Sequence, residues 1–490
     1  MNRQAGRFRL PAALVFALLL SGCTLTNAVK PDSSIKPSDN PVIVDNVTND
    51  KFAAVARQQH PRILATYGGE YSDKKLELMV AKVVGRLTAV SSNPAQTYRI
   101  TLLNSPNVNA FALPGGYLYI TRGLLALAND SSELAAVIAH EMGHVTANHG
   151  QQRQQKEAEE VLAAKVVSDV LGENPNAKAA LVRGKLRLAQ FSRNQELEAD
   201  AIGIKMIGEA GYDAFAAARF LKAMDVFSGM RAVSGASDAS LDFLASHPNA
   251  PQRIDLALRH ARAFGQAGSG EIAREAYLAG IDGMLFGDTP EEGYVRGRRF
   301  LHPLLGVTFS VPDGFVIDNT AAAVTAAGPG EVAVRFDGVT VEGTPALADY
   351  IRSGWVTGLR PETVRTVTIN GNEAARALAE AGGWKFDVTV IRSEGKIYRL
   401  LTAAPLASTQ LESTAEAAAS SFRALTAQEK AALKPLRISV ASASAGDTAA
   451  TLAAKMGGVD RKLDLLRVLN AKTMTSGFSA GEKVKLVIAE

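Results

Sequence analysis

Residues 138–149 read IAHEMGHVTANH, and this stretch decides how the first half of the chain is interpreted. His140 and His144 are four residues apart, so on a helix they lie about 40° apart on one face. Two imidazoles in that arrangement can bind one metal ion, and zinc favours such nitrogen ligands. Glu141 follows His140 directly and would stand beside the metal, where a general base can take a proton from water.

The residues around this motif favour a metal site over a chance pair of exposed histidines. Residues 134–139 are apolar, so the two rings and Glu141 are expected to be buried. Buried polar groups need partners, and a metal ion with water satisfies all three at once. We predict one helix over residues 131–150, with Ser131 or Ser132 as the N-cap and Gly150 as the C-terminal stop.

A catalytic zinc normally has three protein ligands and one open position. On a continuous helix His149 lies about 140° from His144, so we interpret it as a structural or surface residue. Residues 193–200 read RNQELEAD, and on a helix Glu196 and Asp200 share one face. Glu196 could complete a two-histidine, one-glutamate ligand set, and Asp200 could accept the N–H of a ligand imidazole. Taken alone, this segment is more typical of a solvated acidic helix.

The motif HEMGH, followed at residues 196–200 by ExxAD, resembles the HtpX/CaaX-prenyl-protease family of gluzincin metallopeptidases. Two further segments also resemble that family, NAFALPGGYLYITRGLL (109–125) and the histidine-proline motif SHPNAPQRI (246–254), and the flanks of ExxAD in SRNQELEADAIG (192–203) agree, so four motifs follow the family order. The resemblance covers roughly residues 50 to 265. Within that family the chain resembles the periplasmic lipoprotein and outer-membrane quality-control (BepA-like) branch, although we find no tetratricopeptide repeats here.

The resemblance implies one Zn2+ ion per chain and a set of site residues. Glu141 would be the general base, Asp200 would support a ligand from behind, and the metal ligands would be His140, His144 and Glu196. It also implies that Asn109 and His247 lie near the site. Asn109 could donate to the substrate peptide or its oxyanion. His247 could do the same, or it could be a reversible fourth ligand that keeps water out.

The N-terminus resembles a bacterial lipoprotein signal. Three arginines precede the apolar run LPAALVFALLL (10–20), and Leu20-Ser21-Gly22-Cys23 looks like a lipobox. This implies a signal peptide over 1–22, cleavage before Cys23, and a lipid on its sulfur; an ordinary secretory signal is the alternative. The resemblance to Gram-negative lipoproteins implies that Thr24, a residue other than Asp, favours the outer membrane. The periplasmic side of the cell envelope is therefore the expected location, with the lipid as the sole anchor and residues 23–50 as a flexible tether.

Net charge argues against nucleic acid as a partner. The whole chain carries +4, and loss of the three signal-peptide arginines leaves +1. A nearly neutral protein has no electrostatic attraction for a phosphate backbone.

The expected fold class is α+β multidomain. We predict a mainly helical zincin-type peptidase domain with a small sheet at 51–265, a helical connector at 266–295, and an α+β domain of unknown role at 296–430. Residues 435–490 are expected to run strand, helix, helix, strand and resemble a degenerate LysM module. That resemblance implies peptidoglycan contact, whereas the alternative is a packing module without a ligand.

The expected function is a zinc metalloendopeptidase that hydrolyses peptide bonds of unfolded or misassembled envelope polypeptides. A wall-tethered assembly factor or chaperone with latent protease activity is the alternative, because His247 on the zinc would silence the enzyme. A third interpretation, a peptidoglycan hydrolase, depends only on the LysM-like tail.

Overall fold

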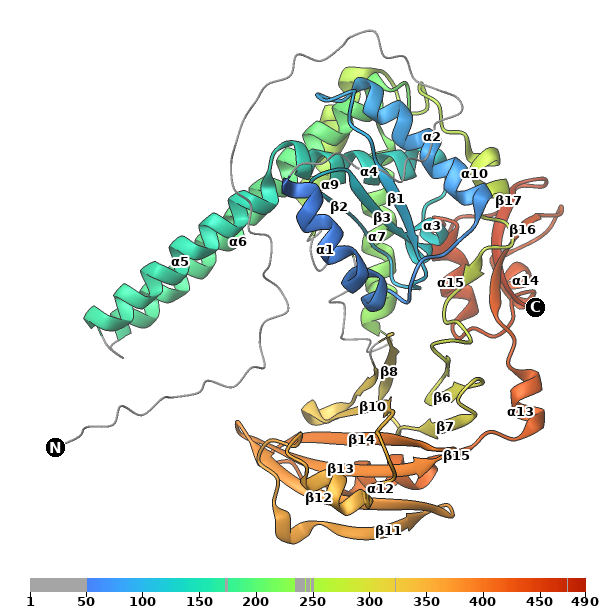
Figure 1. Ribbon diagram of the computed structural model, residues 1–490. Coiled ribbons are helices and arrows are strands. Elements are labelled where there is room, and N and C mark those ends of the chain that lie inside the picture. Colours follow the sequence, from blue (N-terminus) through green and yellow to red (C-terminus); the bar gives the residue numbers. More distant parts are fainter. Residues whose placement is uncertain are drawn as a thin grey trace.

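The computed structural model describes residues 51–490 except 172–174, 234–242, 244–246, 248–250, 322 and 474. The predicted signal peptide, Cys23 and the tether lie outside these residues. The α+β class is confirmed, because a mainly helical region is followed by a sheet-rich one (Figure 1). Within the described residues, no helix is both long enough and apolar enough to cross a membrane.

The first half of the chain contains most of the helices and one small sheet. Its elements are α1 (Lys51–Thr66), α2 (Lys74–Val90), β1 (Arg99–Leu103), β2 (Ala110–Leu113), β3 (Tyr117–Thr121), α3 (Arg122–Leu127), α4 (Ser131–Thr146), α5 (His149–Leu171), α6 (Pro175–Glu209), α7 (Ala216–Val233), α9 (Pro251–Ala261), η1 (Arg262–Phe264) and α10 (Arg274–Ile281). In Figure 1, α5 and α6 pack side by side and project away from the rest of the molecule.

The second half contains two larger sheets and a short C-terminal unit. Its elements are β4 (Leu285–Phe286), β5 (Tyr294–Arg296), β6 (Arg299–His302), β7 (Val307–Ser310), β8 (Val316–Asn319), β9 (Val324–Ala327), η2 (Pro329–Glu331), β10 (Ala333–Val339), α11 (Leu347–Arg352), η3 (Pro361–Thr363), β11 (Arg365–Ile369), β12 (Asn372–Ala381), β13 (Trp384–Ser393), β14 (Lys396–Pro405), α12 (Leu411–Ser421), β15 (Arg423–Ala424), α13 (Ala427–Ala432), β16 (Leu436–Ser442), α14 (Ala449–Ala454), α15 (Lys462–Leu469) and β17 (Lys483–Ala489).

The small sheet of the first half has the order β1-β3-β2, with β1 parallel and β2 antiparallel to β3. Strand β2 therefore forms an edge of this sheet. Tyr117 and Tyr119 of β3 are buried on the face to which α1 contributes Ala56 and Ile63. Helix α4 contacts β2, so the helix with the HEMGH motif lies beside the edge strand.

Helix α4 is almost entirely buried, and it differs from the prediction at both ends. Its N-cap is Asp130, whose carboxylate accepts from the backbone N–H of Glu133, so the prediction of Ser131 or Ser132 was wrong by one or two residues. The helix ends at Thr146 rather than continuing to residue 150. Asn148 has φ 54°, in the left-handed region that Asn tolerates better than most residues, and a new helix starts at His149. Gly150 lies inside that new helix and stops nothing.

Helices α4 and α6 cross at close range because glycine lies on both sides of the contact. A Cβ atom on Gly143 would stand 3.1 Å from the carbonyl oxygen of Ala199, and one on Gly203 would stand 3.0 Å from the backbone nitrogen of His140. These spacings leave little room for any side chain. The close approach brings the HEMGH helix within side-chain reach of the ELEAD segment.

The sheet-rich region comprises a seven-stranded sheet, β11-β12-β13-β14-β10-β9-β8, and a four-stranded sheet, β15-β7-β6-β5. After it, the chain returns to the first half. The predicted order of strand, helix, helix, strand is found in β16, α14, α15 and β17, and β4 pairs with β16 to make a third sheet. Buried side chains of this C-terminal unit (residues 436–489) and of α2, α3, α4 and α7 belong to one hydrophobic core.

Candidate active site

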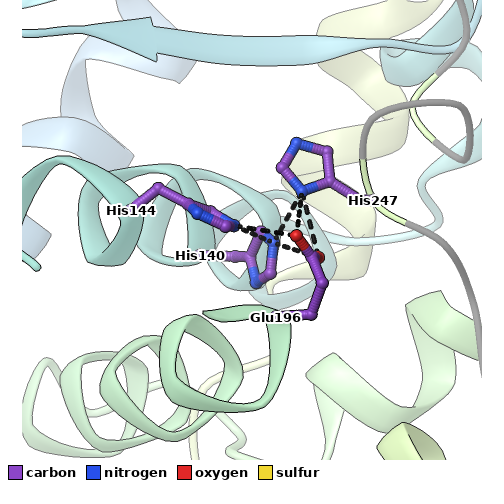
Figure 2. Close-up of side chains that lie close together, drawn as sticks. All are labelled: His140, His144, Glu196 and His247. Atoms are coloured by element: carbon purple, nitrogen blue, oxygen red, sulfur yellow. Dashed lines mark hydrogen bonds and ion pairs between the residues drawn. The ribbon is translucent and has the colours of Figure 1, made fainter. Parts of the chain in front are cut away.

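Four side chains from three segments meet where α4 crosses α6. They are His140 and His144 of α4, Glu196 of α6 and His247, which follows α7; we call them the ligand cluster (Figure 2). One ligand atom from each residue lies within 4.8 Å of all the others. The Nε2 atoms of His140 and His144 are 3.0 Å apart, and Nδ1 of His247 is 3.1 Å from a carboxylate oxygen of Glu196. Three of the four residues are buried.

The orientation of His140 is fixed from behind by Asp200. Its Nδ1 lies 2.9 Å from Oδ1 of Asp200, and a carboxylate can only accept, so Nδ1 carries the proton. When a metal ion displaces the second proton and the ring is neutral, Nε2 presents a lone pair to the centre of the cluster. Among the protein groups alone, burial lowers the pKa of His140, but Asp200 and Glu196 outweigh it and raise that pKa to about 9.

Glu141 is fully enclosed beside the cluster, and its two oxygens differ. Burial raises the pKa of its carboxyl group, and the backbone of Ala112 in the edge strand β2 donates to it. Oε1 is buried and makes no hydrogen bond among the described residues, although Nε2 of His247 lies 3.4 Å away. A buried carboxylate oxygen without a donor is costly. It is therefore a suitable place for a proton taken from a reacting group.

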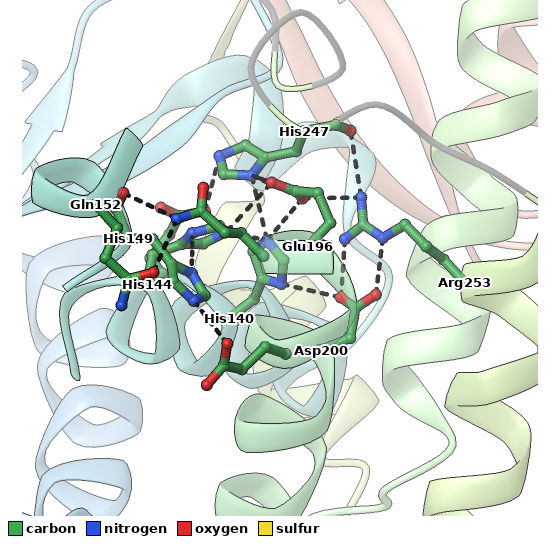
Figure 3. A network of polar contacts seen from close by, with 11 residues as sticks. His140, His144, His149, Gln152, Glu196, Asp200, His247 and Arg253 are labelled. Carbon is green, nitrogen blue, oxygen red and sulfur yellow. Dashed lines mark hydrogen bonds and ion pairs between the residues drawn. The ribbon is translucent and has the colours of Figure 1, made fainter. Parts of the chain in front are cut away.

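His149 is closer to the site than the sequence indicated. The predicted angle assumed one continuous helix, but the break at Asn148 turns His149 back toward α4. Its side chain is buried, and its Nδ1 lies 2.9 Å from Nδ1 of His144 (Figure 3). Its Nε2 lies 3.3 Å from a carboxylate oxygen of Glu198. Burial lowers the pKa of His149. His149 is not one of the four ligand residues. It contacts Nδ1 of His144, the ring nitrogen that is not directed at His140, and so helps to orient that ring.

Asn109 lies immediately before β2 and is buried. Its backbone N–H donates to the hydroxyl of Thr121, and its Nδ2 donates to the hydroxyl of Tyr67. The structure thus places Asn109 at the start of the edge strand and not in the ligand cluster. His247 is connected to the same region, because Phe243, whose ring stacks on that of His247, donates its backbone N–H to the carbonyl of Val108.

Arg253 on α9 is a site residue that the sequence reasoning missed. It is 3% exposed, and its guanidinium donates to both oxygens of Asp200 at 2.7 and 2.8 Å (Figure 3). Its NH1 atom also lies 3.1 Å from Oε2 of Glu196 and donates to the backbone carbonyl of His247 at 3.3 Å. Arg253 thereby connects α9, α6 and the His247 segment. The signal in the sequence was its place six residues after His247, inside the quoted histidine-proline motif.

The residues present fit a divalent metal ion. The cluster combines imidazole nitrogens with one carboxylate, which is the donor set that zinc favours. Burial and the neighbouring rings of His140 and His247 lower the pKa of His144, so its ring is neutral and able to bind a metal. Burial opposes ionisation of Glu196, but His140 and His247 outweigh it and lower its pKa, so the carboxylate is ionised. A cation would satisfy these converging lone pairs together.

A HExxH helix that faces a glutamate from a second helix defines the metallopeptidase class of site. Residues 74–261 match the model described as "Peptidase family M48", and the chain therefore contains a peptidase family M48 domain. This confirms the metallopeptidase resemblance, whereas the LysM-like resemblance stays a prediction.

Two curated relatives illustrate the similarity. The mitochondrial metalloendopeptidase OMA1 of Schizosaccharomyces pombe is 30% identical over 229 residues, which are 44% of this chain and 63% of that protein. The beta-barrel assembly-enhancing protease of Escherichia coli K12 is 31% identical over 146 residues, 28% of this chain and 30% of that protein. The chain thus spans less than two thirds of either relative's length.

Among solved structures, cyanobacterial PsbP from Synechocystis sp. PCC 6803 is similar over 26% of this chain and 91% of that protein. Its identity is 13% and its TM-score 0.21, which is too low to support a conclusion.

Proposed function

We propose that the chain is a zinc-dependent metalloendopeptidase that hydrolyses peptide bonds of unfolded or misassembled envelope proteins. The observation that carries this proposal is the ligand cluster, with four ligand atoms within 4.8 Å of one another, beside a buried carboxylate of which one oxygen makes no hydrogen bond among the described residues. His140, His144 and Glu196 would hold one zinc ion. The M48 domain and the names of the two relatives agree with this reaction class.

The chain's own residues divide the chemistry between them. A bound zinc ion would supply Lewis-acid chemistry, which lets water ionise near neutral pH. Glu141 would take the proton of the attacking water on Oε1 and later return it to the leaving amine. Asp200 would keep the Nδ1 proton of His140 in place, so that Nε2 stays a ligand.

The edge strand β2 is the proposed place for substrate backbone. An extended peptide can add to a free strand edge through main-chain hydrogen bonds, which favours unfolded segments over compact proteins. Ala112 of β2 donates to Glu141, so a peptide paired along this strand would pass close to the proposed base. Asn109 at the start of β2 would donate to the substrate, not to the metal.

The wall-tethered assembly factor with latent protease activity remains the second candidate, and His247 is the observation that favours it. Its Nδ1 is 3.2 Å from Nε2 of His140, so it lies where a fourth ligand would exclude water. Purified protein, Glu141→Gln and His247→Ala should therefore be compared on casein. The first candidate predicts activity in the wild type and a loss of about 10²–10⁴-fold in Glu141→Gln. Activity that appears only in His247→Ala would favour latency.

We also propose a cellular location for the protein and a contact with the peptidoglycan wall. A lipid on Cys23 would hold the protein on the periplasmic side of the outer membrane, and the name of the second relative agrees with an envelope role. The LysM-like unit would contact peptidoglycan. Incubation with purified sacculi tests both ideas that depend on this unit: co-sedimentation would support binding, and release of soluble fragments would favour a peptidoglycan hydrolase instead.

A further inference from the structure

The C-terminal unit is embedded in the molecule to a degree that a separate binding module would not need. In β17, Val484, Lys485, Leu486 and Val487 are all 0–4% exposed. Successive residues of a strand point to opposite faces, so both faces of this strand are covered. A free-standing strand-helix-helix-strand module covers only one face of its sheet with its own helices. Here α3 and α7 contact α15, and α10 contacts both β16 and β17.

Lys485 is the buried charge at the centre of this contact. Its side chain is 0% exposed, and its Nζ donates to the carbonyls of Ala126, Leu127 and Ala128 at 2.7, 3.2 and 2.8 Å. An ammonium group has three donors, and all three are used. The acceptors are carbonyls at the C-terminal end of α3, which lack partners within their helix and attract a cation. Burial lowers the pKa of Lys485, and Glu133 on α4 opposes that shift.

The segment that Lys485 binds leads directly into the metal-site helix. Only Asn129 and Asp130 separate these carbonyls from the first residue of α4. Arg274 of α10 spans the same junction, since it donates to the carbonyl of Asn129 at 2.8 Å and to that of Lys483 at 3.2 Å. Lys485 is itself fixed through its backbone, which exchanges hydrogen bonds of 2.7 and 2.9 Å with the buried side chain of Asn470.

We infer that the C-terminal unit is a positioning element of the peptidase site, in which Lys485 holds the junction between α3 and α4 and so sets the position of the metal-site helix. Lys485 is a positioning residue, not a catalytic one, because it acts through the start of α4. The inference rests on the proposed function for its catalytic consequence, but not for the contact itself. It extends the alternative interpretation of residues 435–490, in which this unit is a packing module without a ligand, by assigning a role to the packing.

The first test is Lys485→Met, which keeps the length and removes the three donors. Lys483→Met is the matched control, because that lysine lies on the same strand and takes part in the contact only through its backbone carbonyl. For Lys485→Met we expect metal affinity, measured by competition with a chromogenic chelator, and kcat on a quenched peptide each to fall about tenfold, with KM little changed. A folded Lys485→Met protein with wild-type metal affinity and kcat would overturn the inference.

A second experiment does not depend on that variant folding. A site for a specific protease is placed at residues 433–435, between α13 and β16, and the full-length folded protein is cut there. We expect the fragment starting at residue 436 to co-elute with the rest, and the amides of residues 129–134 to stay protected from hydrogen exchange. Separation of the fragment while the remainder keeps its metal and this protection would refute the inference. A chain that binds no metal would instead defeat the proposed function, while cutting and exchange would still test the contact.

Discussion

Helix α4 passes through two buried polar clusters that differ in how their charges are balanced. At its start, Asp130, Glu133 and Asp213 lie against Arg219 and Lys485; we call these five residues the N-terminal cluster. Arg219 lies 3.2 Å from Asp130 and 3.4 Å from Glu133 and also pairs with Asp213. Two basic side chains lie among three carboxylates, so the protein supplies its own cations for these buried acids.

The ligand cluster, two to three turns further along the same helix, has no such balance. Its four residues direct ring nitrogens and carboxylate oxygens at one another, and Arg253 contacts the group at Glu196 and at the backbone carbonyl of His247. This difference in charge distinguishes a binding site from a structural network. In a structural network the buried polar groups satisfy one another by hydrogen bonds and ion pairs. A metal site instead leaves nitrogen and oxygen lone pairs that only an added cation satisfies.

Removal of one metal ligand should have the largest effect on zinc binding and peptide hydrolysis. In His144→Ala we expect loss of stoichiometric zinc and of peptide hydrolysis, because two protein ligands are too few for a catalytic site. Wild-type stability should rise by about 4 kcal/mol when free zinc exceeds its Kd 1,000-fold, and the variant should show no such rise. Elemental analysis and thermal unfolding with and without zinc measure both effects.

His260→Ala is the matched control for that experiment, because His260 is an exposed histidine on α9 outside the cluster. It should behave as the wild type. Equal zinc content in the wild type and His144→Ala would show that His144 is not a required zinc ligand and would contradict the proposed three-ligand site.

Arg253 gives the next largest expected effect, since it is the protein cation nearest the ligands. Arg253→Met should lower metal affinity or activity about 10–100-fold, because Asp200 loses both donors that hold it against His140. Arg253→Lys keeps the charge but loses the two-pronged geometry, so it should fall between Arg253→Met and the wild type. Chelator competition on the three proteins gives the order. If Arg253→Lys matched the wild type, charge alone would matter and the proposed orientation of Asp200 would be wrong.

The sequence was informative where the chemistry is local. His140 and His144 were placed on one face by helical periodicity alone, and the order of the C-terminal elements followed from residue patterns. Glu196 could not be assigned this way, because its segment reads as a solvated acidic helix. Its selection depended on the family pattern, and its position depends on the close approach of α4 and α6 at their glycines.

The failures were at contacts between distant segments. His149 is outside the four-residue ligand cluster, in agreement with its interpretation as a structural or surface residue, but the angle on which that interpretation depended was wrong because the left-handed residue Asn148 ends the helix. Arg253 reads as an ordinary surface arginine until α9 packs against α6. In KVKLVIA, the alternation of Lys483 and Lys485 with apolar residues indicates a solvated face, yet Lys485 is buried by α3 from more than 350 positions earlier. No residue pattern within one element carries such information.

The smallest expected effect on metal affinity comes from Arg219, which belongs to the N-terminal cluster and not to the ligand cluster. Its side chain is 35% exposed, so solvent can partly replace it. Arg219→Met should lower the free energy of unfolding by about 1–3 kcal/mol, because the buried oxygens of Asp130, Glu133 and Asp213 lose a shared donor. Metal affinity should change less than in Arg253→Met, since Asp130 still caps α4 and Lys485 still holds the junction before it. Urea unfolding and chelator competition on the same preparations separate these quantities. A loss of metal affinity as large as that in Arg253→Met would mean that the two clusters act as one network along the helix.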